Sequence, residues 1–259
     1  MARRRFTFLG TGTSTGVPAL GCDCEVCRST DPHNKRNRVA AVISSANGNL
    51  LIDTPPELRL ELLHTGIDRI HSVLFTHYHA DHLFGIDDIR QFSKYLGGAM
   101  PVYCTDEVEA SIRTSFAYIF APDGAPTTTY LPKLEFHRIR AGEAFQVLGE
   151  RVLPLDLVHA QFRTLGFKIG NLAYCTDVNR IPEISWSHLE GLDVLVLDAL
   201  RYRPHPAHFG IDEALEVIAK LKPKQAYLTH LSHDFDYEKV NAGLPANVRL
   251  GYDGLSFEF

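Results

Sequence analysis

Several apolar runs in this chain end in histidine or aspartate, and this repeated pattern restricts how the chain can fold. The first run leads into Thr76-His-Tyr-His-Ala-Asp-His, which offers four potential metal ligands within six residues. Three later runs end in one such residue each. Each run predicts a strand, and α/β sheets place their sites at the carboxyl ends of strands. The full set comprises His77, His79, Asp81, His82, His159, Asp177 and His230.

The residue types in this set favour a divalent metal site. Imidazole nitrogen and carboxylate oxygen together suit zinc and manganese. A single histidine after a strand, such as His159 or His230, is more often an ordinary hydrogen-bonded residue. The dense cluster at residues 77–82 and the order of ligands after it favour a catalytic site for two metals over a polar loop with chance histidines.

This order of ligands resembles that of the metallo-β-lactamase-fold hydrolases, over nearly the whole chain. The resemblance implies an α/β fold, specifically a four-layer αββα sandwich. It also implies that Asp53 orients metal ligands, although a helix cap before Pro55 is an equally good interpretation. In the implied centre the first metal is held by His77, His79 and His159, the second by Asp81, His82 and His230, and both by Asp177.

Cys22, Cys24 and Cys27 form a second cluster. Three thiols within six residues suit a structural zinc, which needs four tetrahedral ligands. His233 is the expected fourth ligand. An iron–sulfur cluster usually takes four thiolates. An odd cysteine count without a signal peptide argues against a disulfide framework.

The N-terminal motif Gly10-Thr-Gly-Thr-Ser-Thr-Gly-Val-Pro, together with the cysteines and His233, resembles a phosphodiesterase branch of this family. That branch includes the phosphoribosyl cyclic phosphodiesterase of the carbon–phosphorus lyase pathway. The resemblance adds His208 as a general acid or a phosphate contact, and a helix start is the alternative interpretation. Arg90 and Arg201 are candidate anion contacts, although solvated or salt-bridged side chains are the favoured interpretation.

Length, composition and charge limit the domain organisation, the location and the substrates that can be expected. The 259 residues are expected to form one hydrolase domain, 1–259, with a structural zinc loop near 22–27. Because no apolar run approaches ~20 residues and no signal peptide is evident, a cytoplasmic protein is expected. A net charge of −5 disfavours nucleic acid and leaves a small anionic phosphate ester as the expected substrate. A homodimer is left open.

The sequence therefore predicts a two-metal hydrolase that cleaves a phosphodiester, either small and cyclic or nucleotide-like, by attack of a metal-bound hydroxide. Asp81 and His208 are the expected catalytic residues. A tRNA 3′-processing endonuclease of the same fold is one alternative, but the long Gly/Pro-rich arm of such enzymes is not evident. A lactonase or thioesterase is another. The complete ligand set argues against a non-catalytic zinc protein.

Short apolar runs alternating with helical segments predict two packed sheets covered by helices. A Pro-, Thr- and Gly-rich stretch at 117–132 is expected to form a surface loop or lid. Strands are expected at residues 5–9, 39–44, 49–53, 72–76, 102–103, 134–139, 152–158, 164–169, 172–176, 194–198, 225–229, 248–251 and 255–259. Helices are expected at 57–64, 83–95, 107–116, 211–221 and 237–241.

Overall fold

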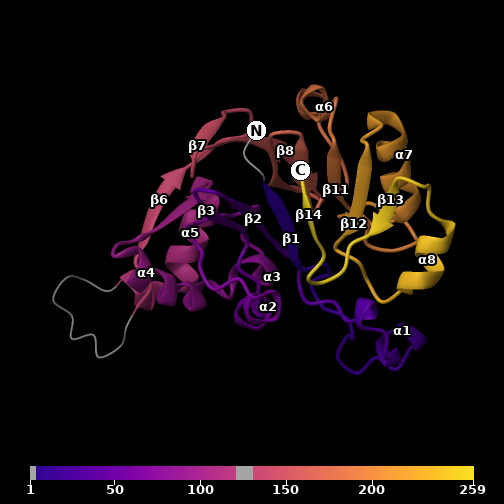
Figure 1. The fold of residues 1–259 in the computed structure, drawn as a ribbon, viewed down its shortest axis with the longest axis horizontal. Helices are drawn as coiled ribbons and strands as arrows, with labels where there is room; N and C mark the ends of the chain where they lie inside the picture. Colours follow the sequence, from indigo (N-terminus) through magenta and orange to yellow (C-terminus); the bar gives the residue numbers. More distant parts are fainter. Residues whose placement is uncertain (1–3, 121–130) are drawn as a thin grey trace.

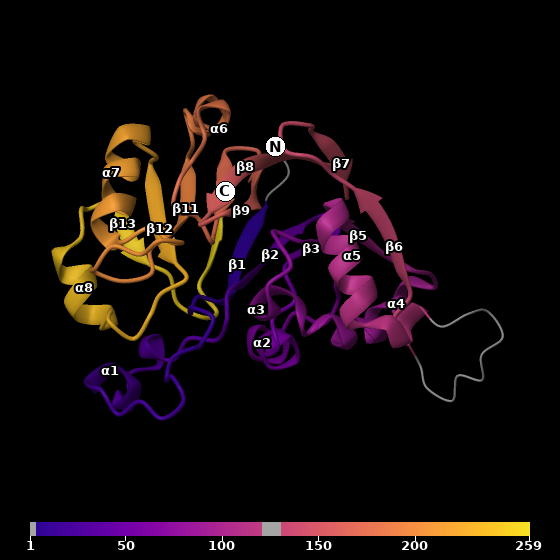
Figure 2. The same ribbon diagram turned by 180° about the vertical axis from the view of Figure 1, so that it is seen from behind.

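Two seven-stranded sheets pack face to face in the computed structural model, which describes residues 4–120 and 131–259 (Figures 1 and 2). The first sheet has the order β14 (Ser256–Glu258), β1 (Arg5–Gly10), β2 (Ala40–Ser45), β3 (Gly48–Ile52), β4 (Ser72–Leu74), β5 (Met100–Cys104) and β6 (Leu134–Arg138). The second has the order β13 (Val248–Leu250), β12 (Gln225–Thr229), β11 (Val194–Asp198), β10 (Leu172–Cys175), β9 (Phe162–Ile169), β8 (Glu150–His159) and β7 (Phe145–Val147).

Helices cover the outer face of each sheet and complete the predicted αββα sandwich. None of the described helices combines the length and the apolar character needed to cross a lipid bilayer. The first sheet is covered by α2 (Leu58–Thr65), α3 (Ala80–Leu83), η2 (Ile86–Ile89), α4 (Arg90–Leu96), α5 (Asp106–Ser115) and η3 (Ala117–Phe120). The second is covered by α6 (Glu183–Leu189), α7 (Ile211–Leu221) and α8 (Tyr237–Gly243). The N-terminal loop carries α1 (Glu25–Arg28) and η1 (Pro32–Asn34).

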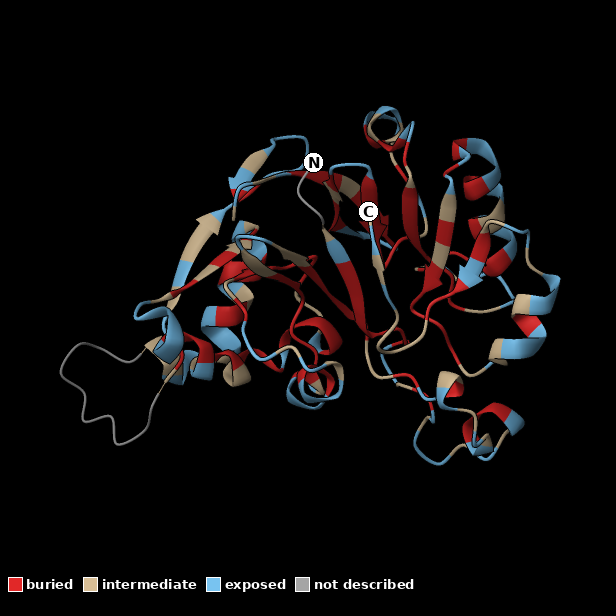
Figure 3. Cartoon of the chain, viewed as in Figure 1, coloured by how far each residue is buried: buried red, intermediate tan, exposed pale blue. Residues whose placement is uncertain are grey.

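Both faces of the central strands are buried, which explains why their sequences are almost continuously apolar. Along β3, Leu50 and Ile52 face the second sheet, whereas Leu51 packs under the helices. The side chains between the sheets include Phe167 and Tyr174, which are fully buried. Figure 3 shows long buried stretches along the strands of both sheets. This rigid interior holds the strand ends in place.

Strand direction brings the ends of several strands to one edge of each sheet. In the first sheet β3, β4 and β5 run parallel. In the second, β10, β11 and β12 run parallel. Both β8 and β10 are antiparallel to β9, so β8 runs in the same direction as β10. The predicted ligands follow the ends of these strands and therefore lie at the same edge.

The structure differs from the sequence prediction in a few elements. The helix predicted at 83–95 is wrong: the chain forms α3, η2 and α4 instead. The break lies at Gly85, whose N–H donates to the carbonyl oxygen of Thr54 over 2.8 Å. The short elements α1, η1, α6 and β7 were also not predicted. The loop or lid expected at 117–132 begins with η3, and residues 121–130 lie outside the described part of the chain.

Close packing at Gly85 predicts that an added methyl group would destabilise the fold strongly. A Cβ atom there would lie 2.0 Å from the carbonyl oxygen of Pro55, whereas one at Gly98 would meet nothing within 4 Å. Gly85→Ala should therefore lower the free energy of unfolding by about 1–3 kcal/mol more than the matched Gly98→Ala. The difference is measured from the midpoints of urea denaturation, with the dependence of unfolding free energy on urea concentration (the m value) unchanged between the variants. Equal midpoints for the two variants would contradict the close packing.

Candidate metal centre

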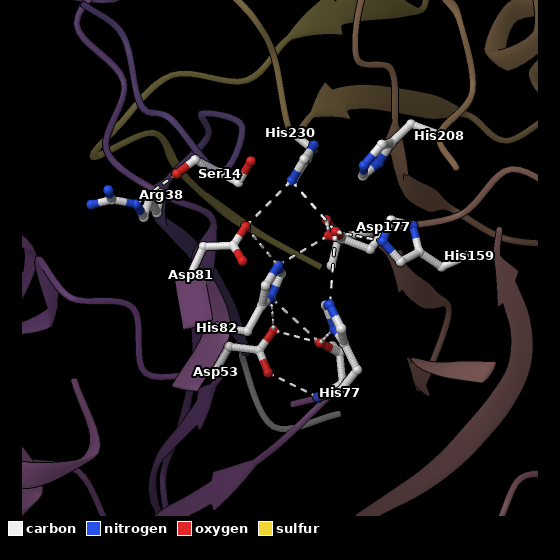
Figure 4. Close-up of polar contacts among 12 residues, drawn as sticks. Ser14, Arg38, Asp53, His77, Asp81, His82, His159, Asp177, His208 and His230 are labelled. Atoms are coloured by element: carbon white, nitrogen blue, oxygen red, sulfur yellow. Dashed lines mark hydrogen bonds and ion pairs between the residues drawn. The ribbon is translucent and has the colours of Figure 1, made fainter. Parts of the chain in front are cut away.

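Left-handed backbone conformations turn three of the strand-end residues toward the candidate centre. Asp53 follows β3, Asp177 lies just beyond β10, and His230 follows β12. Their φ angles are 64°, 52° and 59°. Such angles are uncommon for residues other than glycine and are concentrated at functional sites. Each one ends the alternation of its strand and directs the side chain toward the other members of the set (Figure 4).

His77, His79 and His159 form the first group of potential ligands. One nitrogen from each ring lies within 4.8 Å of the others. The N–H at Nδ1 of His159 donates to the carbonyl oxygen of Ala207 over 2.7 Å, which leaves Nε2 for the site. Nε2 of His77 is buried without a hydrogen-bond partner among the described residues. The group has the composition of a three-histidine metal site.

Asp81, His82, Asp177 and His230 form the second group, again with donor atoms within 4.8 Å of one another. Asp177 also reaches the first group (Figure 4). Its Oδ1 lies 3.9 Å from Nε2 of His77 and 3.5 Å from Nε2 of His230. Its Oδ2 lies 3.2 Å from Nε2 of His82. One carboxylate therefore stands between the two groups, where a bridging ligand would be needed.

Asp53 contacts a candidate ligand and does not cap a helix. Its Oδ2 lies 2.8 Å from Nδ1 of His82 and accepts the hydroxyl hydrogen of Thr76 at the same distance. Its Oδ1 accepts the Thr76 N–H over 2.8 Å. The residue before α2 is instead Glu57, whose side chain makes no cap hydrogen bond. This geometry favours the orienting role over the helix cap, because the contact at Nδ1 leaves Nε2 of His82 directed at the centre.

Burial and the neighbouring charges set the protonation of the centre. Burial lowers the pKa of His77 well below its ordinary value. Burial opposes protonation of His230 as well, but the charges of Asp177 and Asp81 raise its pKa to about 9. Burial also disfavours an ionised Asp177, yet His230 and His82 hold its pKa well below its usual range. An ionised carboxylate among imidazoles is an environment in which a divalent cation would replace protons.

The buried donor atoms fit divalent metal ions. Within residues 4–120 and 131–259, Nε2 of His77, His82 and His230 is buried and has no hydrogen-bond partner. A buried polar atom without a partner is costly. Metal ions would satisfy all three atoms, and the mixture of imidazole and carboxylate donors suits zinc or manganese.

His208 lies against both groups (Figure 4), and a contact with Asp198 holds it there. The His208 ring stacks on His230 with centroids 4.4 Å apart and lies edge-on to His159 at 4.6 Å. Its Nδ1 lies 2.7 Å from Oδ2 of Asp198. The alternative role of His208, at the start of a helix, is taken by Gly210 and Glu213, which cap α7. Sequence reasoning missed Asp198, although it too ends a strand.

The three N-terminal cysteines lie beside His233, the residue expected to be their fourth ligand. One donor atom from each residue lies within 4.8 Å of the others. Nδ1 of His233 is 3.2 Å from Sγ of Cys22 and 3.3 Å from Sγ of Cys24. The Cys27 N–H donates to Cys24 Sγ and lowers the pKa of that thiol to about 6. A thiolate beside an imidazole suits the predicted zinc, and no disulfide occupies these thiols.

The two arginines considered as anion contacts have other partners. Arg90 forms an ion pair with Asp87 at 2.8 Å. Arg201 donates from Nε to the carbonyl oxygen of Arg203 and from a terminal nitrogen to that of Pro204. Arg90 thus agrees with the salt-bridged interpretation, whereas Arg201 is bonded to neighbouring backbone carbonyls, an arrangement not expected from the sequence.

Comparison with known proteins places the chain in a family. The model of the beta-lactamase superfamily domain matches residues 48–231. The chain therefore belongs to this superfamily and has the metallo-β-lactamase fold, the fold of a family of metal-dependent hydrolases. A solved structure described as a new diphosphatase from the PhnP family is similar to it, with 40% identity and a TM-score of 0.93. That likeness covers 100% of this chain and 98% of the other.

Two relatives known by sequence differ in how much of them is matched. A protein of Porphyromonas gingivalis named octanoyltransferase is 38% identical over 254 residues, which are 97% of this chain and 51% of that protein. The chain thus spans about half the length of this relative. A ribonuclease Z of Anoxybacillus flavithermus is 26% identical, and the match covers 96% of this chain and 96% of that protein.

Elemental analysis tests the metal sites. We expect three divalent metals per chain in protein prepared without chelator, two at the His/Asp centre and one at the cysteines. Cys24→Ser should remove one metal, because a structural zinc needs all four ligands. Cys104, buried in β5, supplies the matched control: Cys104→Ala should leave the metal content unchanged. A cysteine-site variant that keeps all its metal would contradict the zinc assignment.

Proposed function

We propose that the protein hydrolyses a phosphodiester, either small and cyclic or nucleotide-like, at a centre of two divalent metals. The position of the Asp177 carboxylate between two groups of ligands carries this proposal. Paired metals are suited to phosphoryl transfer because they stabilise both the attacking and the leaving oxygen. Similarity to a diphosphatase and to a ribonuclease Z gives further support, since both names denote cleavage of phosphorus–oxygen bonds.

Each metal would be held by its own three ligands and by one shared carboxylate. His77, His79 and His159 would hold one metal, and Asp81, His82 and His230 the other, with Asp177 shared. When bound, the metals would polarise the phosphoryl oxygens and lower the pKa of a coordinated water. Asp53 and the carbonyl of Ala207 fix the orientations of His82 and His159.

His208 is proposed to protonate the leaving oxygen. Asp198 accepts the N–H at Nδ1 of His208 and fixes the ring, so that Nε2 can present a proton to the substrate. Oδ2 of Asp198 also accepts the N–H of Val178 over 2.8 Å, which fixes the carboxylate. As the bond to the leaving group breaks, the proton would pass from Nε2 to the departing alkoxide.

A diphosphate is the second candidate substrate. A P–O–P linkage and a phosphodiester both present a tetrahedral phosphorus with charged oxygens and an oxygen leaving group. The diphosphatase similarity at 40% identity over the whole chain favours this class.

RNA and acyl substrates have weaker support. The chain's net charge of −5 disfavours extended contact with a nucleic-acid backbone, despite the ribonuclease Z relative. The octanoyltransferase relative extends well beyond the matched half, so its activity is not carried over to this chain.

Removing one ligand of the second group should abolish activity. We expect Asp81→Ala to lower kcat/KM for bis(p-nitrophenyl) phosphate by about 10³-fold or more, equivalent to ~4 kcal/mol of barrier. A single metal would be unable both to activate water and to clamp the phosphate. The exposed Asp68 supplies the control, since Asp68→Ala should retain full activity. Near-normal turnover in a folded Asp81 variant would show that the second group is not catalytic.

Substrates with different leaving groups distinguish a general acid at position 208 from a residue that only binds the substrate. His208→Ala should slow diesters with alkoxide leaving groups by about 10²–10⁴-fold. It should slow bis(p-nitrophenyl) phosphate much less, because nitrophenolate departs without protonation. The metal content should not change. Equal losses on both substrates would assign His208 to positioning or phosphate binding instead.

A further inference from the structure

The glycine-rich motif after β1 forms a tight turn that the proposed metal centre does not use. The turn is closed by a hydrogen bond of 2.8 Å from the Gly16 N–H to the carbonyl oxygen of Thr13. Gly16 has a φ of 64°, a conformation that glycine adopts without strain. Ser14 and Thr15 stand exposed at its tip. Such a conspicuous motif calls for a role beyond chain reversal.

Contacts on two sides fix this turn beside the second group of ligands. The Thr13 N–H donates to the carbonyl oxygen of Leu231, the residue after His230, over 3.1 Å. From the other side, Nε of Arg38 donates to the carbonyl oxygen of Ser14 over 2.8 Å. Arg38 is itself held by an ion pair with Glu57. The turn is therefore anchored to the segment that carries a proposed metal ligand.

Glycine is required for this close approach. A Cβ atom at Gly12 would lie 2.8 Å from the carbonyl oxygens of Arg36 and Asn37. The chain at this point is bridged to Arg38 on one side and to Leu231 on the other. The motif thus allows the turn to pass tightly between two strand-like segments and reach the edge of the centre.

The Ser14 hydroxyl points toward the centre. In Figure 4 Ser14 lies between Arg38 and His230, above Asp81, with the hydroxyl on the side of His230. The Arg38 guanidinium lies on the opposite side of Ser14 and points away from the histidines. Arg38 therefore positions the turn, and the Ser14 hydroxyl is directed toward the second group of ligands.

Ser14 offers hydrogen-bond donors and few acceptors. The carbonyl oxygens of Thr13 and Ser14 are already engaged by Gly16 and Arg38. Neither the N–H nor the hydroxyl of Ser14 has a partner within the described ranges, 4–120 and 131–259. Phosphoryl oxygens act almost only as acceptors, so a donor surface next to a proposed cationic centre fits a second phosphoryl group.

We propose that Ser14 binds the second phosphoryl group of a diphosphate whose first phosphoryl group lies at the metals, which favours the second candidate substrate class, the diphosphates, over simple diesters at the same centre. This inference rests on the proposed function and deepens it. Water adds to the first phosphorus, and the bridging P–O bond breaks. The electron pair leaves with the second phosphate, which takes up a proton and departs as a free phosphate or phosphate monoester.

The test compares Ser14→Ala with Thr15→Ala in the metal-loaded protein. Among residues 4–120 and 131–259, the Thr15 hydroxyl contacts only the carbonyl oxygen of its neighbour Gly16, at 3.4 Å, so this variant is a matched control on the same turn. For adenosine diphosphate, kcat/KM should fall about 10–100-fold in Ser14→Ala, as expected for one hydrogen bond to a charged group. For bis(p-nitrophenyl) phosphate the loss should be much smaller. Ser14→Thr, which keeps the hydroxyl, should restore most of the diphosphate activity.

Calorimetric titration gives a readout that does not depend on turnover. Ser14→Ala should weaken binding of imidodiphosphate, which resists hydrolysis, and should change binding of inorganic phosphate much less. Equal losses with both substrates, or no loss with either, would overturn the assignment of Ser14. A wild-type protein that cleaves the diester but not adenosine diphosphate would overturn it while leaving the proposed function intact. If neither substrate is cleaved, the proposed function fails and this inference fails with it.

Discussion

The structure depends on one constraint: polar side chains are buried at the point where several strands end. Ring nitrogens of His77, His82 and His230 are withdrawn from water around the Asp177 carboxylate. Without a compensating cation this arrangement would be costly, because buried polar atoms need partners. The surrounding apolar layers impose it nonetheless, since the strands that bury Leu74 and Tyr174 lead directly into His77 and Asp177. The fold therefore holds the ligands in place, and metal binding would offset the free-energy cost of burying their polar atoms without partners.

Much of this arrangement could be predicted from the sequence because the signal is local. The cluster at 77–82 and the strands ending near His159, Asp177 and His230 mark the ligands directly, since strand direction alone brings them to one edge. The cysteines could be paired with His233 because metal chemistry demands a fourth ligand. In each case residue type and position after a strand carry the information.

Other features depend on contacts that the sequence does not display. Asp198 ends a strand like the ligands do, yet its role follows only from the position of His208, ten residues later in a loop. The choice between two roles for Asp53 required the contact with His82. The break at Gly85 arises from packing against Thr54 and Pro55, while the local sequence favours a continuous helix. Tertiary contacts decided all three.

Each group of ligands draws residues from both sheets. His77 and His79 follow a strand of the first sheet, whereas His159 ends one of the second. The other group is divided in the same way, with Asp81 and His82 opposite Asp177 and His230. A metal bound to either group would act as a clamp between the two layers. Separation of the sheets would then require release of the ions, so the rate at which bound metal exchanges with solution would report how often the sandwich opens.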